Sequence, residues 1–137
     1  MFTELEIYKD NGHFFFELGQ KLPKVCNAPE KPGVYYIVRL CRGQVDLVYI
    51  GASGTINQRG DFGDQLLYSR LNNKQNGVPR QKFFEDIMKK QGIDALDIYW
   101  FVTFDNDHHH LPSYVEALLL QKHFELFDCL PEWNKAF

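Results

Sequence analysis

The sequence has no long hydrophobic run, few cysteines and little net charge. None of its apolar stretches approaches the roughly 18 residues that a bilayer-spanning helix needs. The N-terminus, MFTELEIYKDNG, carries acidic residues where a signal peptide would have a positive region followed by an apolar core. The three cysteines (Cys26, Cys41 and Cys129) are an odd, widely spaced set, which favours reduced thiols over a disulfide framework or a zinc site. These features predict a soluble, cytoplasmic protein.

The chain also shows no repeat, no low-complexity tract and no linker. Its 137 residues are 45% apolar and 15% aromatic, which is enough to bury the core of one globular domain. Residues 29–137 are expected to form that domain. Residues 1–28 carry apolar clusters, such as Phe14 to Phe16, and are expected to be an N-terminal extension docked on the core.

Basic charge is concentrated in one segment of an otherwise acidic chain. The net charge is −3, yet residues 70–90 hold six basic and two acidic side chains, whereas residues 91–137 hold two basic and eight acidic ones. A basic segment of this kind suits contact with nucleic-acid phosphates. Amphipathic helices also carry charge on the face turned to water, so the ordinary structural interpretation stays open.

Hydrophobic periodicity predicts a small mixed α/β (α+β) domain. Strands are expected over residues 33–40, 45–51 and 96–104, and helices over residues 64–74, 80–91 and 112–127. The first two strands are too closely connected for a crossover, so they should be antiparallel. The order of elements predicts a three-stranded antiparallel sheet flanked by helices.

Two short motifs that each contain a tyrosine and a glycine occupy the first two predicted strands. They are Gly33-Val34-Tyr35 in PGVYYIVRL and Tyr49-Ile50-Gly51 in VDLVYIGAS. A three-residue loop at residues 42–44 would pair Cys41 with Val45 and place Tyr35 opposite Gly51. The two tyrosines would then share one sheet face as diagonal neighbours, roughly 7–8 Å apart at the backbone. The space beside Gly51 would either admit a substrate or relieve crowding around the ring of Tyr35.

Paired motifs of this type resemble the signature of the GIY-YIG nuclease superfamily. The family also places an arginine in the helix after the second motif, and LYSRLNNK supplies Arg70. It places a glutamate in a later helix, where LPSYVEALLLQKH supplies Glu116, and it often ends with a proline and an asparagine, here Pro131 and Asn134. The ordered set spans roughly residues 29 to 137.

The resemblance implies a metal-dependent DNA endonuclease that hydrolyses phosphodiester bonds. In that family's chemistry, Tyr35 would be the general base toward water and Arg70 would stabilise charge on the scissile phosphate. Tyr49 would help to position the phosphate, Glu116 would hold one Mg²⁺ (or Mn²⁺), and Asn134 would fix local hydrogen bonds. A free phenol has a pKa near 10, so Tyr35 would need nearby cations to act as a base.

Residue chemistry supports a metal role for Glu116 without requiring one. It lies at the edge of the apolar stripe of its helix, beside Leu119 and Leu120, so its carboxylate is expected to be partly desolvated. A single carboxylate with open coordination suits magnesium, which retains several waters. A glutamate at the rim of a core that simply reaches water is the alternative.

Three further basic residues, Lys74, Arg80 and Lys82, are expected to bind the DNA. Some family members have a histidine or tyrosine where this chain has Lys74, and a lysine does not shuttle protons at neutral pH unless its pKa falls. A catalytically inactive nucleic-acid- or protein-binding module with the same fold is therefore the alternative function. A partner chain or a homodimer could also supply the specificity.

Two other features are expected to be structural. His108, His109 and His110 are consecutive and have no acidic or cysteine partner at ligand spacing, so a role in a loop is favoured over metal binding. Trp133 beside Asn134 could stack on a base, but a tryptophan near a terminus more often seals the edge of a core.

Overall fold

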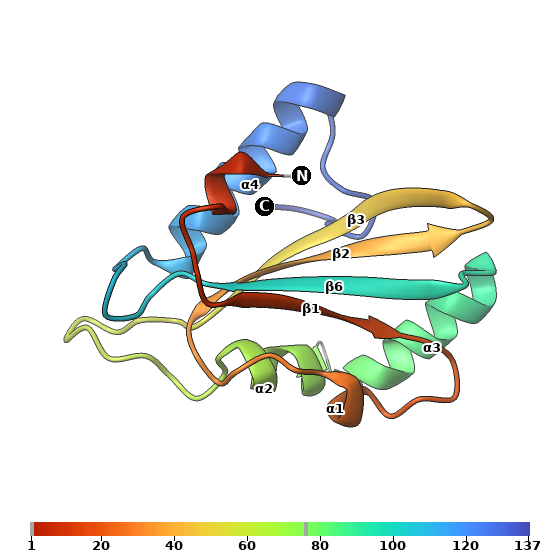
Figure 1. Cartoon of the computed structure of the whole chain (residues 1–137), viewed down its shortest axis with the longest axis horizontal. Coiled ribbons are helices and arrows are strands. Elements are labelled where there is room, and N and C mark those ends of the chain that lie inside the picture. Colours follow the sequence, from red (N-terminus) through yellow and green to blue (C-terminus); the bar gives the residue numbers. More distant parts are fainter. Residues whose placement is uncertain (1, 76) are drawn as a thin grey trace.

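The protein, analysed as a computed structural model that describes residues 2–75 and 77–137, combines one main sheet with helices on both of its faces (Figure 1). The strands of the main sheet are β1 (Asn11–Phe16), β2 (Gly33–Cys41), β3 (Gln44–Ser53) and β6 (Ala95–Val102). The helices are η1 (Thr3–Leu5, a 3₁₀ turn), α1 (Leu22–Val25), α2 (Leu67–Asn72), α3 (Arg80–Gln91) and α4 (Pro112–Phe127). A two-stranded ladder joins β4 (Lys74–Gln75) to β5 (Val78–Pro79).

The sheet is open, antiparallel and four-stranded, in the order β1-β6-β2-β3. The predicted mixed α/β class is thus confirmed, but the prediction of three strands is wrong. The fourth strand, β1, comes from the segment expected to be a docked extension. Its alternating residues Phe14 and Phe16 are buried on one face, and its backbone pairs with β6 along its whole length. Pairing removes an exposed edge of β6, which a docked segment would have left open.

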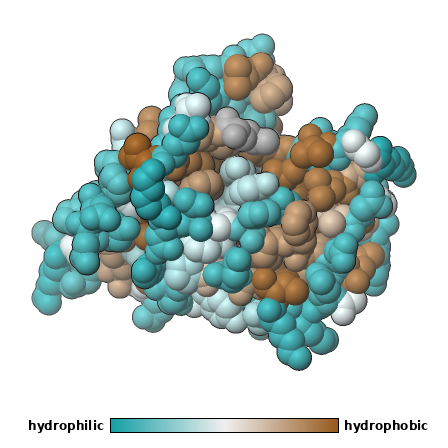
Figure 2. All heavy atoms as spheres, in the orientation of Figure 1, coloured by the Kyte–Doolittle hydropathy of each residue, from teal (hydrophilic) through white to brown (hydrophobic). Residues whose placement is uncertain are grey.

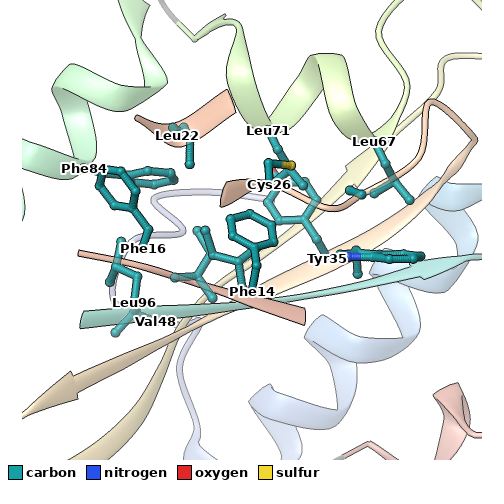
Figure 3. Close-up of a cluster of buried hydrophobic side chains, with 14 of the residues drawn as sticks. Phe14, Phe16, Leu22, Cys26, Tyr35, Val48, Leu67, Leu71, Phe84 and Leu96 are labelled. Atoms are coloured by element: carbon teal, nitrogen blue, oxygen red, sulfur yellow. The ribbon is translucent and has the colours of Figure 1, made fainter. Parts of the chain in front are cut away.

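Each face of the sheet has its own hydrophobic core. Helices α1, α2 and α3 cover one face, and α4 lies on the other, over β2 and β3 (Figure 1). The strand period of two sends Tyr35 and Ile37 toward the first core and Val34 and Tyr36 toward the second. Figure 3 shows the first core, in which Tyr35 points from β2 toward the helices.

The face of the sheet on which α4 lies is only partly covered. Most of the surface in Figure 2 is hydrophilic, and hydrophobic side chains show over the part of the sheet where β1 runs toward α3. Phe15 on β1, which points away from the first core, is 48% exposed. Among the described residues, no helix is both long enough and apolar enough to cross a membrane.

Two helices have the bounds that the sequence predicted. Helix α3 ends where Gly92 adopts a left-handed conformation with φ of 68°, and α4 begins with Pro112 in its first turn. Helix α2 is shorter than the predicted 64–74. It starts at Leu67 because Leu66 is extended and the Leu67 amide donates to the carbonyl of Lys31.

The β2–β3 hairpin reaches the expected register by an unexpected route. Its turn has two residues, Arg42 and Gly43, with φ of 53° and 78°, so Cys41 pairs with Gln44 and not with Val45. This turn alone would place Tyr49 on the face opposite to Tyr35. A β-bulge at Val48 inserts one residue into β3 and returns Tyr49 to the face of Tyr35. Tyr35 therefore opposes Gly51, and Ile37 opposes Tyr49.

Candidate functional site at the end of the hairpin

The two motif tyrosines lie on the same face of the hairpin, as the sequence predicted. Their ring centroids are 5.9 Å apart, and the planes are inclined by 33°. Tyr35 is 1% exposed and belongs to the first core, whereas Tyr49 is partly buried and packs against that core. The bulge at Val48 is what turns Tyr49 toward Tyr35.

Close packing explains both motif glycines. A Cβ atom on Gly51 would lie 2.6 Å from Cζ of Tyr35 and 2.8 Å from Cε2 of Tyr49. A Cβ atom on Gly33 would lie 2.1 Å from the carbonyl oxygen of Phe101 on the neighbouring strand. The space at Gly51 is therefore filled by the two tyrosine rings, which supports relief of crowding and not an opening for substrate beside Tyr35.

A buried arginine holds the hydroxyl of Tyr35. Arg80, the first residue of α3, is 3% exposed, and its Nη2 donates a hydrogen bond to the Tyr35 hydroxyl. Its Nε donates to the carbonyl of Arg70 at 3.3 Å, and its guanidinium carbon is 5.8 Å from the ring centroids of both Tyr35 and Tyr49. Arg80 thus links α2, α3 and the hairpin.

That Arg80 binds DNA stays a prediction, but the residue is buried against Tyr35 and is not part of an exposed surface. The sequence offers no local signal for its burial, because a basic residue at the start of an amphipathic helix is usually solvated. What buries Arg80 is a phenol 45 residues away together with the free carbonyl of Arg70.

A polar cavity of about 240 Å³ brings together most of the predicted site residues. Tyr35, Tyr49, Arg70 and Glu116 all line it, and they come from four different elements. Arg80 completes the cationic side, and the remaining lining residues are small or polar: Ala52, Ser53, Gly54, Thr55 and Ser113. The first turns of α4 meet the end of β3 at this cavity, which is how Glu116 joins residues from the other face of the sheet.

The charges in the cavity are partly desolvated. Burial raises the pKa of the Glu116 carboxyl, and the positive charge of Arg70 lowers it by a smaller amount. Within the described part of the chain, Glu116 has no hydrogen-bond partner or ion pair, and the buried Nε of Arg70 has none either. Both groups are therefore free to contact a ligand in the cavity.

Tyr35 is held in its protonated form at neutral pH. Burial raises the pKa of its hydroxyl above the ordinary value of 10.0, and the charges of Arg80 and Arg70 act in the opposite direction. The two arginines stabilise the phenolate, although at neutral pH they do not overcome the cost of desolvating it.

Among the described residues that line the polar cavity, Glu116 is the one carboxylate that could bind a metal ion. Across residues 2–75 and 77–137 there is no group of three or more His, Cys, Asp or Glu side chains that could form a closed metal site. The partly buried, unpaired carboxylate of Glu116 fits an ion that retains several waters and takes further oxygens from a phosphate, as Mg²⁺ does.

Asn134 fastens the C-terminal segment to the edge strand. Its Nδ2 donates to the carbonyl of Ile50 and its Oδ1 accepts from the amide of Ile50, both at 2.9 Å. The amide of Trp133 donates to the carbonyl of Val48 at 2.8 Å. The segment therefore extends the ladder beside β3, next to the bulge. Asn134 does not line the cavity that holds Glu116, but it lines the neighbouring one.

The two lysines predicted to bind DNA lie outside the polar cavity. Lys74 is exposed on the β4–β5 ladder. Lys82 is exposed on α3, where its Nζ pairs with Asp86 at 3.3 Å, one helical turn away. Neither lines the cavity, so of the three residues predicted to bind DNA only Arg80 adjoins it.

The three consecutive histidines lie in the loop before α4 and contact the N-terminal segment. Nδ1 of His110 is 2.7 Å from the hydroxyl of Tyr8, and Nε2 of His108 is 3.2 Å from the carbonyl oxygen of Ile7. His109 stacks on Phe104 with ring centroids 4.9 Å apart. These contacts tie residues far apart in the chain to each other and agree with the predicted structural role.

Comparison of this chain with protein-family models, with curated proteins and with solved structures gives no match.

Proposed function

We propose that this chain is a divalent-metal-dependent DNA endonuclease of the GIY-YIG type. The observation that carries the proposal is the shared cavity: Tyr35, Tyr49, Arg70 and Glu116 line it, although they come from β2, β3, α2 and α4. Among the described residues, the Glu116 carboxylate and the Arg70 Nε have no partner, and packing alone gives no reason for both to lie in one cavity with two phenols.

Each side chain has a role that its surroundings support. Arg70 binds the scissile phosphate and offsets the charge that develops on it, because its Nε has no partner in the described protein. Glu116 holds the metal ion, which supplies Lewis acidity at the phosphate when it is bound. Tyr49, which lines this cavity and the neighbouring one, positions the phosphate.

Tyr35 accepts the proton of the attacking water in this mechanism. It must first lose its own proton to the solvent that enters the cavity, and Arg80 and Arg70 are the cations that lower its pKa against the effect of burial. Arg80 is thus a positioning residue, since it holds the hydroxyl of Tyr35 and stabilises its phenolate. Asn134 keeps the β3 edge and the C-terminal segment in place behind Tyr49.

The experiment is incubation of the protein with supercoiled plasmid and with branched oligonucleotides, with Mg²⁺, with Mn²⁺ and with a chelator. Metal-dependent nicking that is lost in Glu116→Gln supports the proposal. Glu125→Gln is the matched control, because Glu125 is exposed on the same helix. Nicking at the wild-type rate in Glu116→Gln would assign the activity to a contaminant.

A second candidate function is a binding module with the same fold and no catalytic activity. The burial of Tyr35 favours this function. The residue is 1% exposed, and its hydroxyl accepts a hydrogen bond from Arg80. In that case the cavity binds a phosphate through Arg70 without cleaving it. Metal-independent DNA binding with no nicking under any condition distinguishes this function from the first.

A further inference from the structure

A second cavity adjoins the proposed nuclease site. It measures about 390 Å³, within the roughly 300–1,000 Å³ of pockets that take small molecules. Tyr49 and Arg80 line both cavities, so the two cavities are neighbours that share these side chains as a wall. The other lining residues come from β2, β5, α3 and the C-terminal segment: Ile37, Val78, Phe83, Phe84, Trp133, Asn134, Lys135 and Ala136.

The walls of this second cavity are aromatic. Tyr49, Phe83 and Trp133 each present a ring to it, and the rings of Phe83 and Trp133 meet edge to face with centroids 6.0 Å apart. Phe83 is 38% exposed although it is a large apolar side chain on a helix that buries its neighbour Phe84 completely. The cavity is thus lined by three aromatic side chains that the protein leaves at least partly exposed.

Positive charge lies at this cavity, and none of the described residues that line it is acidic. Lys135 is exposed at its rim, and Arg80 lies on the wall shared with the polar cavity. Flat aromatic walls with a cation beside them are the combination by which proteins hold single-stranded nucleic acid, because bases stack on the rings while the phosphates meet the cations.

We propose that this cavity receives an unpaired nucleobase of the DNA strand, next to the phosphate bound by Arg70. This inference rests on the proposed function and names its substrate class. Base pairs in a duplex expose only their edges, so a paired base would have to be flipped out of the stack at a cost of a few kcal/mol, whereas an unpaired base is already accessible. The preferred substrate is therefore DNA with unpaired nucleotides at the cleavage site, such as a single-stranded flap, and not an intact duplex.

The test measures binding without metal, so that cleavage does not enter. Three fluorescently labelled DNAs of the same length are titrated with the protein: a duplex, a duplex with a single-stranded flap, and the same flap with abasic sites at the two unpaired positions beside the junction. The flap should bind about tenfold more tightly than the duplex, and the abasic flap should lose that difference, because one stacked base contributes at this level.

Phe83→Ala should reduce the preference for the flap to less than twofold. Phe127→Ala is the matched control, since Phe127 is 62% exposed at the far end of α4. A second readout does not depend on affinity. The flap should quench tryptophan emission and the abasic flap should not, and this quenching reports on Trp133 because the remaining tryptophan, Trp100, is only 6% exposed.

Equal binding of duplex and flap by the wild-type protein would overturn this proposal, and so would an unchanged preference in Phe83→Ala. An apolar segment of another protein would then be the better occupant of the cavity. The outcome is separable from that of the proposed function. Metal-dependent cleavage without a flap preference would overturn only the proposal that the cavity binds a base. A flap preference without cleavage would overturn only the proposal that the protein is a nuclease.

Discussion

The guanidinium of Arg80 donates a hydrogen bond to the hydroxyl of Tyr35, and both residues are almost completely buried. This contact joins the first strand of the hairpin to the start of α3, across 45 residues of sequence. It gives the tyrosine a structural role that is independent of any chemistry. The consequences for mutagenesis can be measured on the protein alone.

Tyr35→Phe should lower the free energy of unfolding by about 1–3 kcal/mol, because it leaves a buried, charged donor on Arg80 without its acceptor. Tyr114→Phe is the control, since Tyr114 is 55% exposed. Urea unfolding of both variants measures the difference. Equal stabilities of Tyr35→Phe and the wild type would mean that Arg80 finds another partner or water in solution.

Gly51→Ala should destabilise the protein by about 1–3 kcal/mol, since a methyl group there would lie within 3 Å of both tyrosine rings. It should also abolish any cleavage, because Tyr35 and Tyr49 would have to move apart. Gly63→Ala is the matched control, as the nearest atom to its added Cβ is the Thr55 carbonyl oxygen at 3.8 Å. Thermal unfolding of the two variants tests the contrast, and similar melting temperatures would contradict it.

Glu116→Gln should stabilise the protein at neutral pH in the absence of metal and DNA. Burial raises the pKa of Glu116 in the folded state, so its ionisation costs stability once the pH rises above the unfolded value of about 4.5. The advantage of the variant should disappear below about pH 4, where the carboxyl is protonated in both states. Denaturation midpoints at several pH values check this, with Glu125→Gln as the control. A pH-independent difference would assign the effect to packing.

Asn134→Ala should cost about 1–3 kcal/mol, because it removes both hydrogen bonds to the backbone of Ile50. Hydrogen exchange at the Ile50 amide should become faster as the C-terminal segment separates from β3. Asn73→Ala, at an exposed position after α2, should change neither quantity. Unchanged exchange at Ile50 would show that the segment is held by its other contacts, such as the Trp133 amide.

The cleavage rate should rise with pH if Tyr35 is the general base. Because burial raises the pKa of Tyr35, only a small fraction is ionised at neutral pH, and kcat/KM should increase about tenfold per pH unit from about pH 7 to pH 9 without a plateau. Substrate binding measured over the same range is the control. A plateau near pH 7 would assign the base to another group.

Much of the fold could be predicted because the relevant signals are local. The bounds of α3 and α4 follow from apolar periodicity, from Gly92 and from Pro112, and the structure has the same bounds. The shared face of Tyr35 and Tyr49 was also predicted. The reason for this shared face was not predicted. The two-residue turn and the bulge at Val48 were both missed, and their effects on which face Tyr49 occupies cancel each other.

The fourth strand was missed because its partner is distant in sequence. Residues 11–16 pair with β6 residues that lie 80 to 90 positions later in the chain, and nothing in their own pattern specifies that partner. An alternating apolar segment can pair in a sheet or pack as an extension. Only the free edge of β6 in the assembled sheet selects between them.

By itself, the sequence determined three strands of the main sheet and the bounds of α3 and α4, because propensity and periodicity act over a few residues. It also placed Tyr35, Tyr49, Arg70 and Glu116 in an order that suggested a common site. The tertiary structure alone decided that Arg80 is buried on Tyr35, that Lys74 and Lys82 lie outside the cavity, and that an aromatic cavity adjoins the site. Those features depend on which distant surfaces meet when the helices pack on the sheet, and no local pattern encodes such a meeting.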